Sequence, residues 1–240
     1  MSAPLRTPAS WTAVVAAALA ARARRRPAKR PRVVDLFAGA GGASWGATLA
    51  DCDVVAAANH DPRMLATHAR AIPWAQHLRE DLERLSPMAL PAHDVLWASP
   101  ECTGHTRARG KERLHHDASR ATAWCPIRVA DYHRPPLVLC ENVVDLRRWD
   151  MLRAWLVAWE CLGYVEDTAR PGASLDASRF DPAAHGAVLD SADFGVPQSR
   201  PRLFFVFRDP RQAPAPVDIA RSPSAHVPVR GVIDWDTSRG

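Results

Sequence analysis

The sequence predicts an α/β fold in which a mostly parallel sheet carries helices on both faces. Apolar runs of strand length alternate with segments of helical periodicity from residue 33 to residue 162, a pattern typical of parallel sheets. With 47% hydrophobic and 24% charged residues in 240, the chain has the composition of a globular domain with a substantial core. No window reaches the roughly 18 uninterrupted apolar residues of a membrane helix, which argues against a membrane protein.

The first half of the chain supplies the clearest alternation. An alanine-rich helix is expected at residues 12–26, because Pro27 and Pro31 end it before the strong strand signal at 33–37. Residues 43–50 favour a helix and residues 53–58 a strand. A helix at 62–70 and a short apolar strand at 94–98 come next.

The second half repeats the pattern with longer polar interruptions. Residues 119–132 favour a helix and 137–140 a buried strand after two prolines. A helix is expected at 151–162, with apolar spacing at Leu152, Trp155, Leu156 and Trp159. Residues 170–186 indicate a loop, residues 203–207 a last strand, and the Pro-rich segment from Pro210 lacks periodicity.

The charge is distributed unevenly. Residues 1–32 hold eight Arg or Lys and no acid, so this arm carries +8 and leaves −3 on the remainder of a net charge of +5. Such an arm suits a polyanion such as DNA, and a solvated helix followed by a linker would look the same. The expected organisation is a basic arm at 1–32, a catalytic domain at 33–208 and a tail at 209–240.

The five cysteines at positions 52, 102, 125, 140 and 161 include no C-x-x-C pair. An odd count without paired spacing argues against a zinc site or a disulfide framework, and no metal is expected. Reduced thiols in a cytoplasm are the simplest interpretation.

The sharpest motif is VVDLFAGAGGASWG, in which Gly39, Gly41 and Gly42 follow the first strand and open a helix. Glycines at the carboxyl end of a parallel strand let backbone amides approach a nucleotide-like ligand. The spacing is neither G-x-G-x-x-G nor a phosphate loop with G-K-[ST], which disfavours a dinucleotide or ATP site. Ordinary turn glycines are the alternative.

Polar side chains end the neighbouring segments. Asn59, His60 and Asp61 close the second strand, where they can bond ribose hydroxyls, and Asp81 follows the third segment, where it can meet an adenine edge. The alternatives are a helix cap for Asp61 and a surface acid for Asp81.

A further strand ends in Pro100, Glu101 and Cys102 and leads into a polar, basic loop. Positive charge can lower the pKa of a thiol at such a place and make it a nucleophile. Taken alone, Cys102 is better explained as a buried, inert cysteine.

Four ordered motifs, DLFAGAGG, SPEC, LCENV and FGVPQSRPRLFFV, make the chain similar to the DNA cytosine-5 methyltransferase family over residues 33–206. The resemblance implies a Rossmann-like fold that binds S-adenosylmethionine over the strand ends and a flipped-out cytosine in DNA. It implies that Cys102 attacks C6 of cytosine, that Glu141 binds N3 and the exocyclic amine, that Arg200 and Arg202 reach the base oxygen O2 and a phosphate, and that Asn142 braces the active-site loop.

The cofactor site implied by the resemblance and the strand-end pattern consists of residues at the ends of the parallel strands: Asp35, Phe37, Gly39, Gly41, Gly42, Asn59, His60, Asp81 and Pro100. Four members of the wider site have simpler interpretations. Phe37 could be a core aromatic, Glu141 a strand-end acid bonded to nearby amides, and the two arginines part of a solvated edge strand.

Several positions depart from the family pattern. Glu101 stands where the family has a second proline, Asn59 where it has Glu, and Thr103-Gly104-His105-Thr106 where it has Gln-x-Phe-Ser. A carboxylate next to a nucleophilic thiol opposes thiolate formation unless it points away or is paired.

About 30 residues follow Arg208, fewer than the family's target recognition domain and last cofactor motif need. We therefore expect a truncated or split DNA (cytosine-5-)-methyltransferase, cytoplasmic and nucleoid-associated, of the restriction-modification type, with a second polypeptide for target recognition. A minimal enzyme and a decayed gene product are further options. The alternative function is a non-catalytic module that binds S-adenosylmethionine or DNA; a dehydrogenase is disfavoured.

Overall fold

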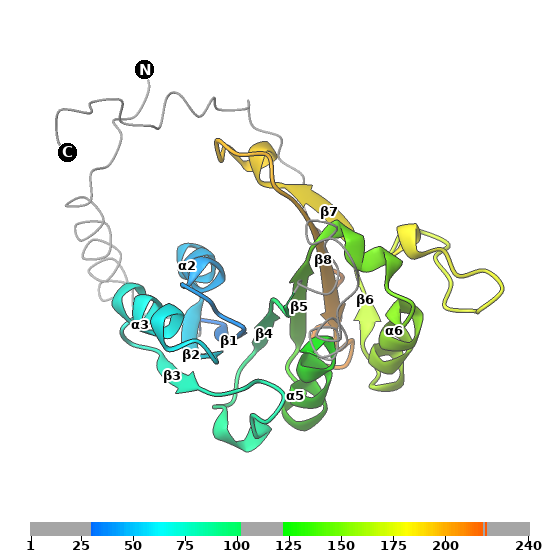
Figure 1. Ribbon diagram of the computed structural model, residues 1–240. Coiled ribbons are helices and arrows are strands. Elements are labelled where there is room, and N and C mark those ends of the chain that lie inside the picture. The colour runs from blue at the N-terminus through cyan, green and yellow to red at the C-terminus, as the bar shows by residue number, and fades with distance from the viewer. Residues whose placement is uncertain (1–29, 102–121, 218, 220–240) are drawn as a thin grey trace. The chain divides into compact units, whose positions relative to one another are not determined.

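The computed structural model describes residues 30–101, 122–217 and 219 (Figure 1). The chain divides into two compact units, a larger one of residues 31–189 and 201–220 and a smaller one of residues 1–30, 190–200 and 221–240. The helix expected at 12–26 lies outside the described residues.

The larger unit is built on an eight-stranded sheet with the order β3-β2-β1-β4-β5-β8-β6, and β7 pairs with β8. The strands are β1 Arg32–Leu36, β2 Asp53–Asn59, β3 Gln76–Arg79, β4 Val95–Ala98, β5 Leu137–Asn142, β6 Val165–Glu166, β7 Ala187–Asp190 and β8 Pro201–Arg208. Strands β1 to β5 are parallel, whereas β8 runs antiparallel to β5 and β6. The predicted α/β fold with a mostly parallel sheet is confirmed.

Four described α-helices pack on this sheet: α2 Gly42–Leu49, α3 Pro62–Ala71, α5 Cys125–His133 and α6 Leu152–Cys161. Short 3-10 turns are η1 Pro87–Ala89, η2 Thr122–Trp124, η3 Val144–Arg148, η4 Pro182–Ala184 and η5 Ser191–Phe194. Helices α2 and α3 contact strands β1 to β3, and α5 contacts β4. The four corresponding predicted helices are present.

The structure corrects three details of the predicted elements. The helix expected at 119–132 is a 3-10 turn at Thr122–Trp124 followed by α5, because Pro126 stands in the first turn of the helix. Strands β3, β6 and β7 were not predicted, since β3 and β6 lack an apolar run and the apolar run of β7, Ala-Val-Leu, is short. The expected loop at 170–186 contains the short turn η4.

The core of the larger unit centres on the inner face of α6. All four apolar positions predicted for this helix, Leu152, Trp155, Leu156 and Trp159, are 1–2% exposed. The Trp159 ring stacks on Phe207 with ring centroids 4.5 Å apart, and the Trp155 indole donates a hydrogen bond of 2.8 Å to the Ala123 carbonyl. The amphipathic spacing therefore places α6 on β8.

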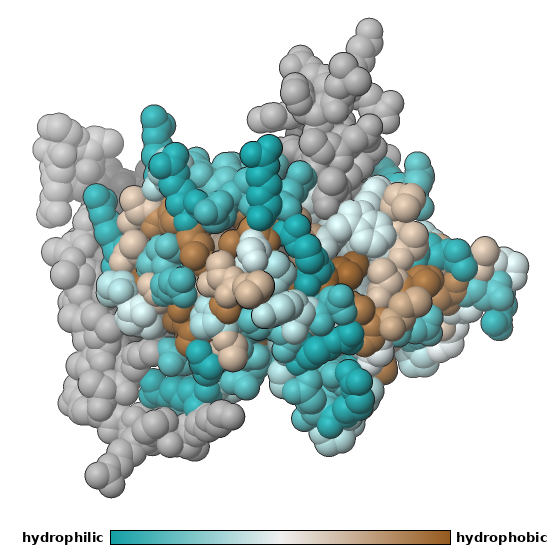
Figure 2. All heavy atoms as spheres, turned by 90° about the horizontal axis from the view of Figure 1, so that it is seen from below, coloured by the Kyte–Doolittle hydropathy of each residue, from teal (hydrophilic) through white to brown (hydrophobic). Residues whose placement is uncertain are grey.

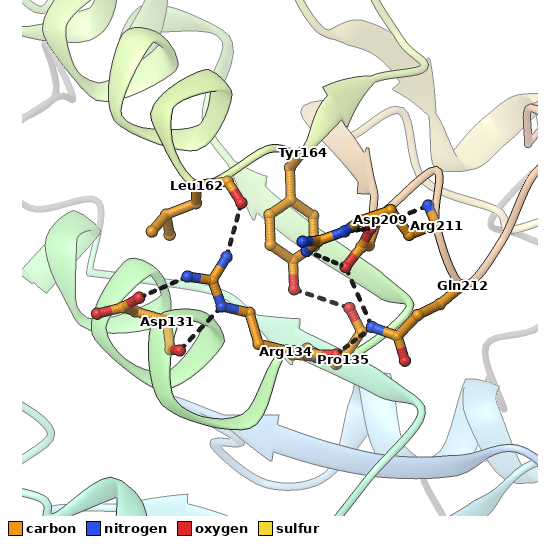
Figure 3. A network of polar contacts seen from close by, with 8 residues as sticks. All are labelled: Asp131, Arg134, Pro135, Leu162, Tyr164, Asp209, Arg211 and Gln212. Atoms are coloured by element: carbon orange, nitrogen blue, oxygen red, sulfur yellow. Dashed lines mark hydrogen bonds and ion pairs between the residues drawn. The ribbon is translucent and has the colours of Figure 1, made fainter.

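A polar network secures the chain beyond β8 at the amino end of β5 (Figure 3). Arg134, in the left-handed region at φ 51, donates to the Leu162 carbonyl at 2.6 Å and accepts from the Gln212 amide at 2.6 Å. Hydrogen bonds from Arg211 hold the pKa of the buried Asp209 carboxyl well below its usual range. These contacts fix the backbone at the amino ends of the parallel strands, whereas the glycine turn lies at their carboxyl ends.

The described part of the smaller unit is the segment 190–200, which contains η5. The Asp190 carboxylate accepts hydrogen bonds from the backbone N–H groups of Ala192 and Arg200, at 3.0 and 2.7 Å, and from the Ser199 hydroxyl at 2.6 Å. Gly195 ends η5 at φ 78. The Asp190 carboxylate therefore links the two ends of the segment 190–200 through hydrogen bonds.

Surface polarity gives no sign of a membrane-spanning element. Among the residues that the structure describes, no helix is long and apolar enough to cross a bilayer. On the face drawn in Figure 2, hydrophobic side chains lie in small groups among hydrophilic ones.

Candidate functional site

The sequence-predicted site residues of the larger unit gather at the carboxyl edge of the parallel strands. The chain proceeds from β1 outward to β2 and β3, then returns to β4 on the other side of β1. Such a switch point opens a crevice at the strand ends, where open α/β sheets bind ligands. Strand β8 begins at this edge because it is antiparallel to β5.

The glycine turn between β1 and α2 has the backbone geometry that a close ligand approach needs. Phe37, Gly39 and Gly41 have positive φ values of 60°, 51° and 101°. The Gly41 N–H donates to the Ala38 carbonyl at 3.0 Å, and the Gly41 carbonyl accepts from Trp45 as α2 begins. A Cβ on Gly41 would lie 3.1 Å from Cδ2 of His68, whereas one on Gly42 would meet nothing within 4 Å. A side chain at Gly41 would therefore be strained both by the positive φ and by the His68 ring.

The polar residues after β2 divide into capping and exposed groups. The buried Asn59 accepts a hydrogen bond from the Asp61 N–H at 2.8 Å, and Asp61 caps α3 by accepting from Arg63 and Met64. These backbone bonds lower the pKa of Asp61. The helix-cap interpretation of Asp61 is confirmed, and His60 is left as the exposed side chain at this strand end.

Glu101 does not stand alone at the end of β4. Its Oε1 lies 3.7 Å from Nδ1 of His60, which comes from the end of β2. Asp81 stays at the surface, where it accepts from the Glu83 N–H at 3.1 Å and lies 3.8 Å from Arg84. Glu101 therefore has His60 as a partner. Such a pairing is what the sequence analysis required if the Glu101 charge is not to oppose formation of a neighbouring thiolate.

Asp35 lies inside the protein, beneath the glycine turn. The residue is 1% exposed, its Oδ2 accepts a 2.6 Å hydrogen bond from the Ser44 hydroxyl, and its Oδ1 has no partner among the described residues. Burial raises the pKa of Asp35 to about 7, although its hydrogen bonds with Ser44 lower it. The sequence motif indicated Asp35 but gave no sign of Ser44, because hydroxyl residues are common in helices for many reasons.

The ends of β4 and β5 are tied together by Asn142. Its side-chain amide donates a hydrogen bond of 3.1 Å to the carbonyl of the buried Pro100, which precedes Glu101. This contact is the one expected of a residue that braces the active-site loop. Cys102, the expected nucleophile, lies outside the described residues.

Glu141 and Arg202 form an ion pair at the same edge. Oε1 of Glu141 lies 3.0 Å from Nε of Arg202, and the two side chains are 22% and 20% exposed. Strand β8 lies between β5 and β6, so the interpretation of Arg202 as part of a solvated edge strand is wrong. Arg200 belongs to the smaller unit, where its side chain is exposed and its backbone N–H binds Asp190.

The residues present fit an S-adenosyl group. The turn has left-handed backbone at Gly39 and Gly41, an orphaned carboxylate oxygen lies on Asp35 of β1, and polar side chains follow the neighbouring strands. No group of three or more His, Cys, Asp or Glu in the described ranges is arranged to hold a metal ion.

Comparison with known proteins identifies the family. Residues 31–227 match the C-5 cytosine-specific DNA methylase family. The chain belongs to this family. The DNA methylase domain therefore takes in all eight strands and both arginines of the QSRPR segment, so the sequence-based resemblance is confirmed.

Curated members of the family match at low identity. The chain is 26% identical over 176 residues to the type II methyltransferase M.HhaI of Haemophilus parahaemolyticus, covering 73% of this chain and 48% of that protein. It is 30% identical over 181 residues to M.HgiBI of Herpetosiphon aurantiacus, covering 73% and 36%. The chain thus spans about half or less of the length of these relatives.

Among solved structures, a Spodoptera frugiperda DNMT2 variant is similar in fold. The TM-score is 0.62 at 20% identity, and the match covers 86% of this chain and 60% of that one. This likeness establishes the shared Rossmann-like architecture of the methylase domain.

Proposed function

We propose that the chain transfers a methyl group from S-adenosylmethionine to C5 of cytosine in DNA. The observation that carries this proposal is the ion pair of Glu141 and Arg202 at the sheet edge that also holds the glycine turn. Family membership supports the reaction class. We assign the chemistry to residues 33–208, DNA attraction to the basic arm 1–32 and the start of a missing or separate recognition region to the Pro-rich tail 209–240.

The cofactor would rest over the glycine turn. Backbone amides at Gly39 and Gly42 would approach its amino-acid portion, Gly41 would shape the turn through its bond to the Ala38 carbonyl, and Asp35 would lie beneath it. Phe37, Asn59, His60, Asp81 and Pro100 would line the sides. When bound, S-adenosylmethionine supplies an electrophilic methyl group on a sulfonium centre.

The protein must make C5 of cytosine nucleophilic, because this ring carbon is weakly reactive by itself. In the proposed mechanism the Cys102 thiolate forms a bond to C6, and the electron pair of the C5–C6 double bond moves toward C5. Glu141, as the carboxylic acid, donates a proton to N3 and stabilises the charge that accumulates in the ring. After C5 has gained the methyl group, solvent water takes the C5 proton, the thiolate departs from C6 and N3 returns its proton to Glu141, which restores the aromatic ring and the starting acid.

Arg202 serves two purposes in this scheme. Its guanidinium orients Glu141 through the 3.0 Å contact, and its remaining N–H groups would bind the base oxygen O2. Arg200 would contact a phosphate. The exposed fraction of about a fifth on both Glu141 and Arg202 leaves these side chains accessible to an extruded base.

The decisive experiment traps the covalent intermediate. Duplex DNA containing 5-fluorocytosine should form a denaturation-resistant adduct with the full-length chain in the presence of S-adenosylmethionine, because fluorine cannot leave C5 as a cation. Cys102→Ser should abolish the adduct. Cys161→Ser is the matched control, since Cys161 is an exposed free cysteine and should leave adduct yield unchanged.

Binding without transfer separates the catalytic proposal from the alternative. If calorimetry shows S-adenosylmethionine binding but no adduct and no methyl transfer occur, the chain is a binding module. The second polypeptide expected from the sequence stays a prediction. It is tested by adding the products of adjacent genes to the transfer assay and measuring the gain in rate and in site preference.

A further inference from the structure

A continuous chain of polar groups runs beneath the glycine turn, and only its inner end, Asp35, belongs to the sequence motifs and the proposed cofactor site. The Ser44 hydroxyl contacts Asp35 Oδ2 at 2.6 Å and His68 Nε2 at 2.9 Å. His68 Nδ1 in turn lies 2.9 Å from Nε2 of His77. The four groups come from four elements, β1, α2, α3 and β3.

The chain leads from a fully buried carboxylate toward the surface. Ser44 and His68 are 0% exposed and Asp35 is 1% exposed, whereas His77 is partly exposed on the edge strand β3. Asp35 therefore has no contact with solvent of its own. Ser44, His68 and His77 give it a hydrogen-bonded path outward.

The inner end of this chain faces no other charge. Asp35 is registered with Ala57 of β2 and Trp97 of β4, and the groups that shift its pKa, apart from burial, are both on Ser44 of α2. His68 is influenced by His77, and His77 by a hydrogen bond with the Ala75 backbone. The charge of Asp35 is thus uncompensated by the described side chains around it.

We propose that Asp35, Ser44, His68 and His77 form a proton relay that couples the charge of Asp35 to the charge of the cofactor above the glycine turn. The proposal rests on the proposed function, because it takes the ligand to be S-adenosylmethionine. That ligand carries a sulfonium cation, whereas its product S-adenosylhomocysteine carries a neutral thioether. A buried carboxylate interacts strongly with a nearby cation because little water screens the pair.

Proton transfer along the relay balances atom by atom. With Asp35 protonated, its O–H donates to Ser44, Ser44 donates to Nε2 of His68, and His68 Nδ1–H donates to Nε2 of His77. When each proton moves one step outward, Asp35 is ionised, every hydrogen bond is reversed, and His77 is left as an imidazolium. The partly exposed His77 then gives up one proton to solvent, so one proton leaves the protein.

The protonation ranges of the groups suit this role. Burial raises the pKa of Asp35 to about 7, so its proton can leave near neutral pH. Burial and the neighbouring His77 lower the pKa of His68 to about 4, so this ring stays neutral with one donor and one acceptor nitrogen. Burial also lowers the pKa of His77, which favours release of the transferred proton.

The first experiment measures protons released on binding. Calorimetry of the full-length chain at pH 7, in buffers of different ionisation enthalpy, should show release of about half a proton with S-adenosylmethionine and much less with S-adenosylhomocysteine. From pH 6 to pH 8, affinity for S-adenosylmethionine should rise about 10-fold, against less than about 2-fold for the homocysteine. Asp35→Asn should remove both differences. Any difference that remains in this variant measures titration of the ligands themselves.

The second experiment tests the relay itself. His68→Gln keeps an N–H donor for Ser44 but cannot pass a proton on, so release followed with a pH indicator should lag behind binding followed by tryptophan fluorescence. His93→Gln is the matched control, since His93 is also buried with its pKa lowered to about 4 but bonds the Pro91 carbonyl instead. Proton release by His93→Gln should keep pace with ligand binding.

The outcomes separate this inference from the proposed function. Binding of both ligands with equal proton release would refute the coupling, and release by His68→Gln at the wild-type rate would refute the relay, while the methyltransferase proposal would stand. If the wild-type chain bound neither ligand, both proposals would fail. Thermal unfolding of each variant, compared with wild type, shows that a changed release does not come from a damaged fold.

Discussion

At the scale of single residues, the pairing of Glu141 with Arg202 holds an acidic side chain in place at the carboxyl edge of the sheet. Both side chains are about four-fifths buried, and the arginine fixes one carboxylate oxygen at 3.0 Å. The second carboxylate oxygen of Glu141 remains available to the extruded cytosine. A charged partner of this kind also holds the carboxylate in one orientation, which reduces the freedom lost when the base binds.

Glu141→Gln should therefore lower the rate of methyl transfer by about 100-fold or more, because the amide cannot donate a proton as an acid does. Affinity for S-adenosylmethionine should change little, since the cofactor residues lie on β1, β2 and β4. Transfer of labelled methyl groups to DNA and calorimetry measure the two quantities. Glu160→Gln, an exposed change on α6, is the control; an equal loss there would contradict the assignment.

Gly41 makes a second prediction at this scale. Gly41→Ala puts a Cβ at 3.1 Å from the His68 ring and forces a residue with a side chain to φ 101. We expect a loss of about 1–3 kcal/mol in folding stability and weaker cofactor binding, measured by urea unfolding and calorimetry. Gly46→Ala, with nothing within 4 Å in the middle of α2, should instead stabilise the fold by about 0.5–1 kcal/mol. Destabilisation by both variants would show that α2 itself is intolerant.

At the scale of elements, periodicity and motif order predicted the central strands and four helices, because these are long and strongly apolar on one face. Strand β3, with the sequence QHLR, carries no such pattern, since an edge strand is held by pairing with β2 more than by burial. The polar relay escaped prediction for a related reason. Its members are single residues on four elements, and only the sheet order brings them together.

Helix α6 tests how far element packing determines stability. Trp159 is 1% exposed and stacks on Phe207, with Trp155 and Tyr164 edge-on to it. Trp159→Ala should reduce the free energy of unfolding by about 3–5 kcal/mol, through lost burial and a cavity between α6 and β8. Chemical denaturation measures this. Leu49→Ala at a 70% exposed position should stay within about 0.5 kcal/mol, and a similar loss at both positions would argue against a core centred on α6.

At the scale of the whole molecule, the two signs of charge are separated along the chain. The arm of residues 1–32 carries +8 and the remainder −3, so the catalytic domain alone should repel a DNA backbone weakly. If the arm supplies the attraction, replacing Arg24, Arg25 and Arg26 together by Gln should reduce the salt dependence of DNA binding. Each lost phosphate contact removes about 0.9 from the slope of log Kobs against log salt concentration, so the change can reach about 3. Fluorescence anisotropy with one duplex at several salt concentrations gives the slope.

The matched variant replaces Arg70, Arg84 and Arg179, all exposed on the described part of the chain, and changes the net charge equally. A slope that falls equally in both variants would mean that net charge, and not the arm, governs the approach of DNA.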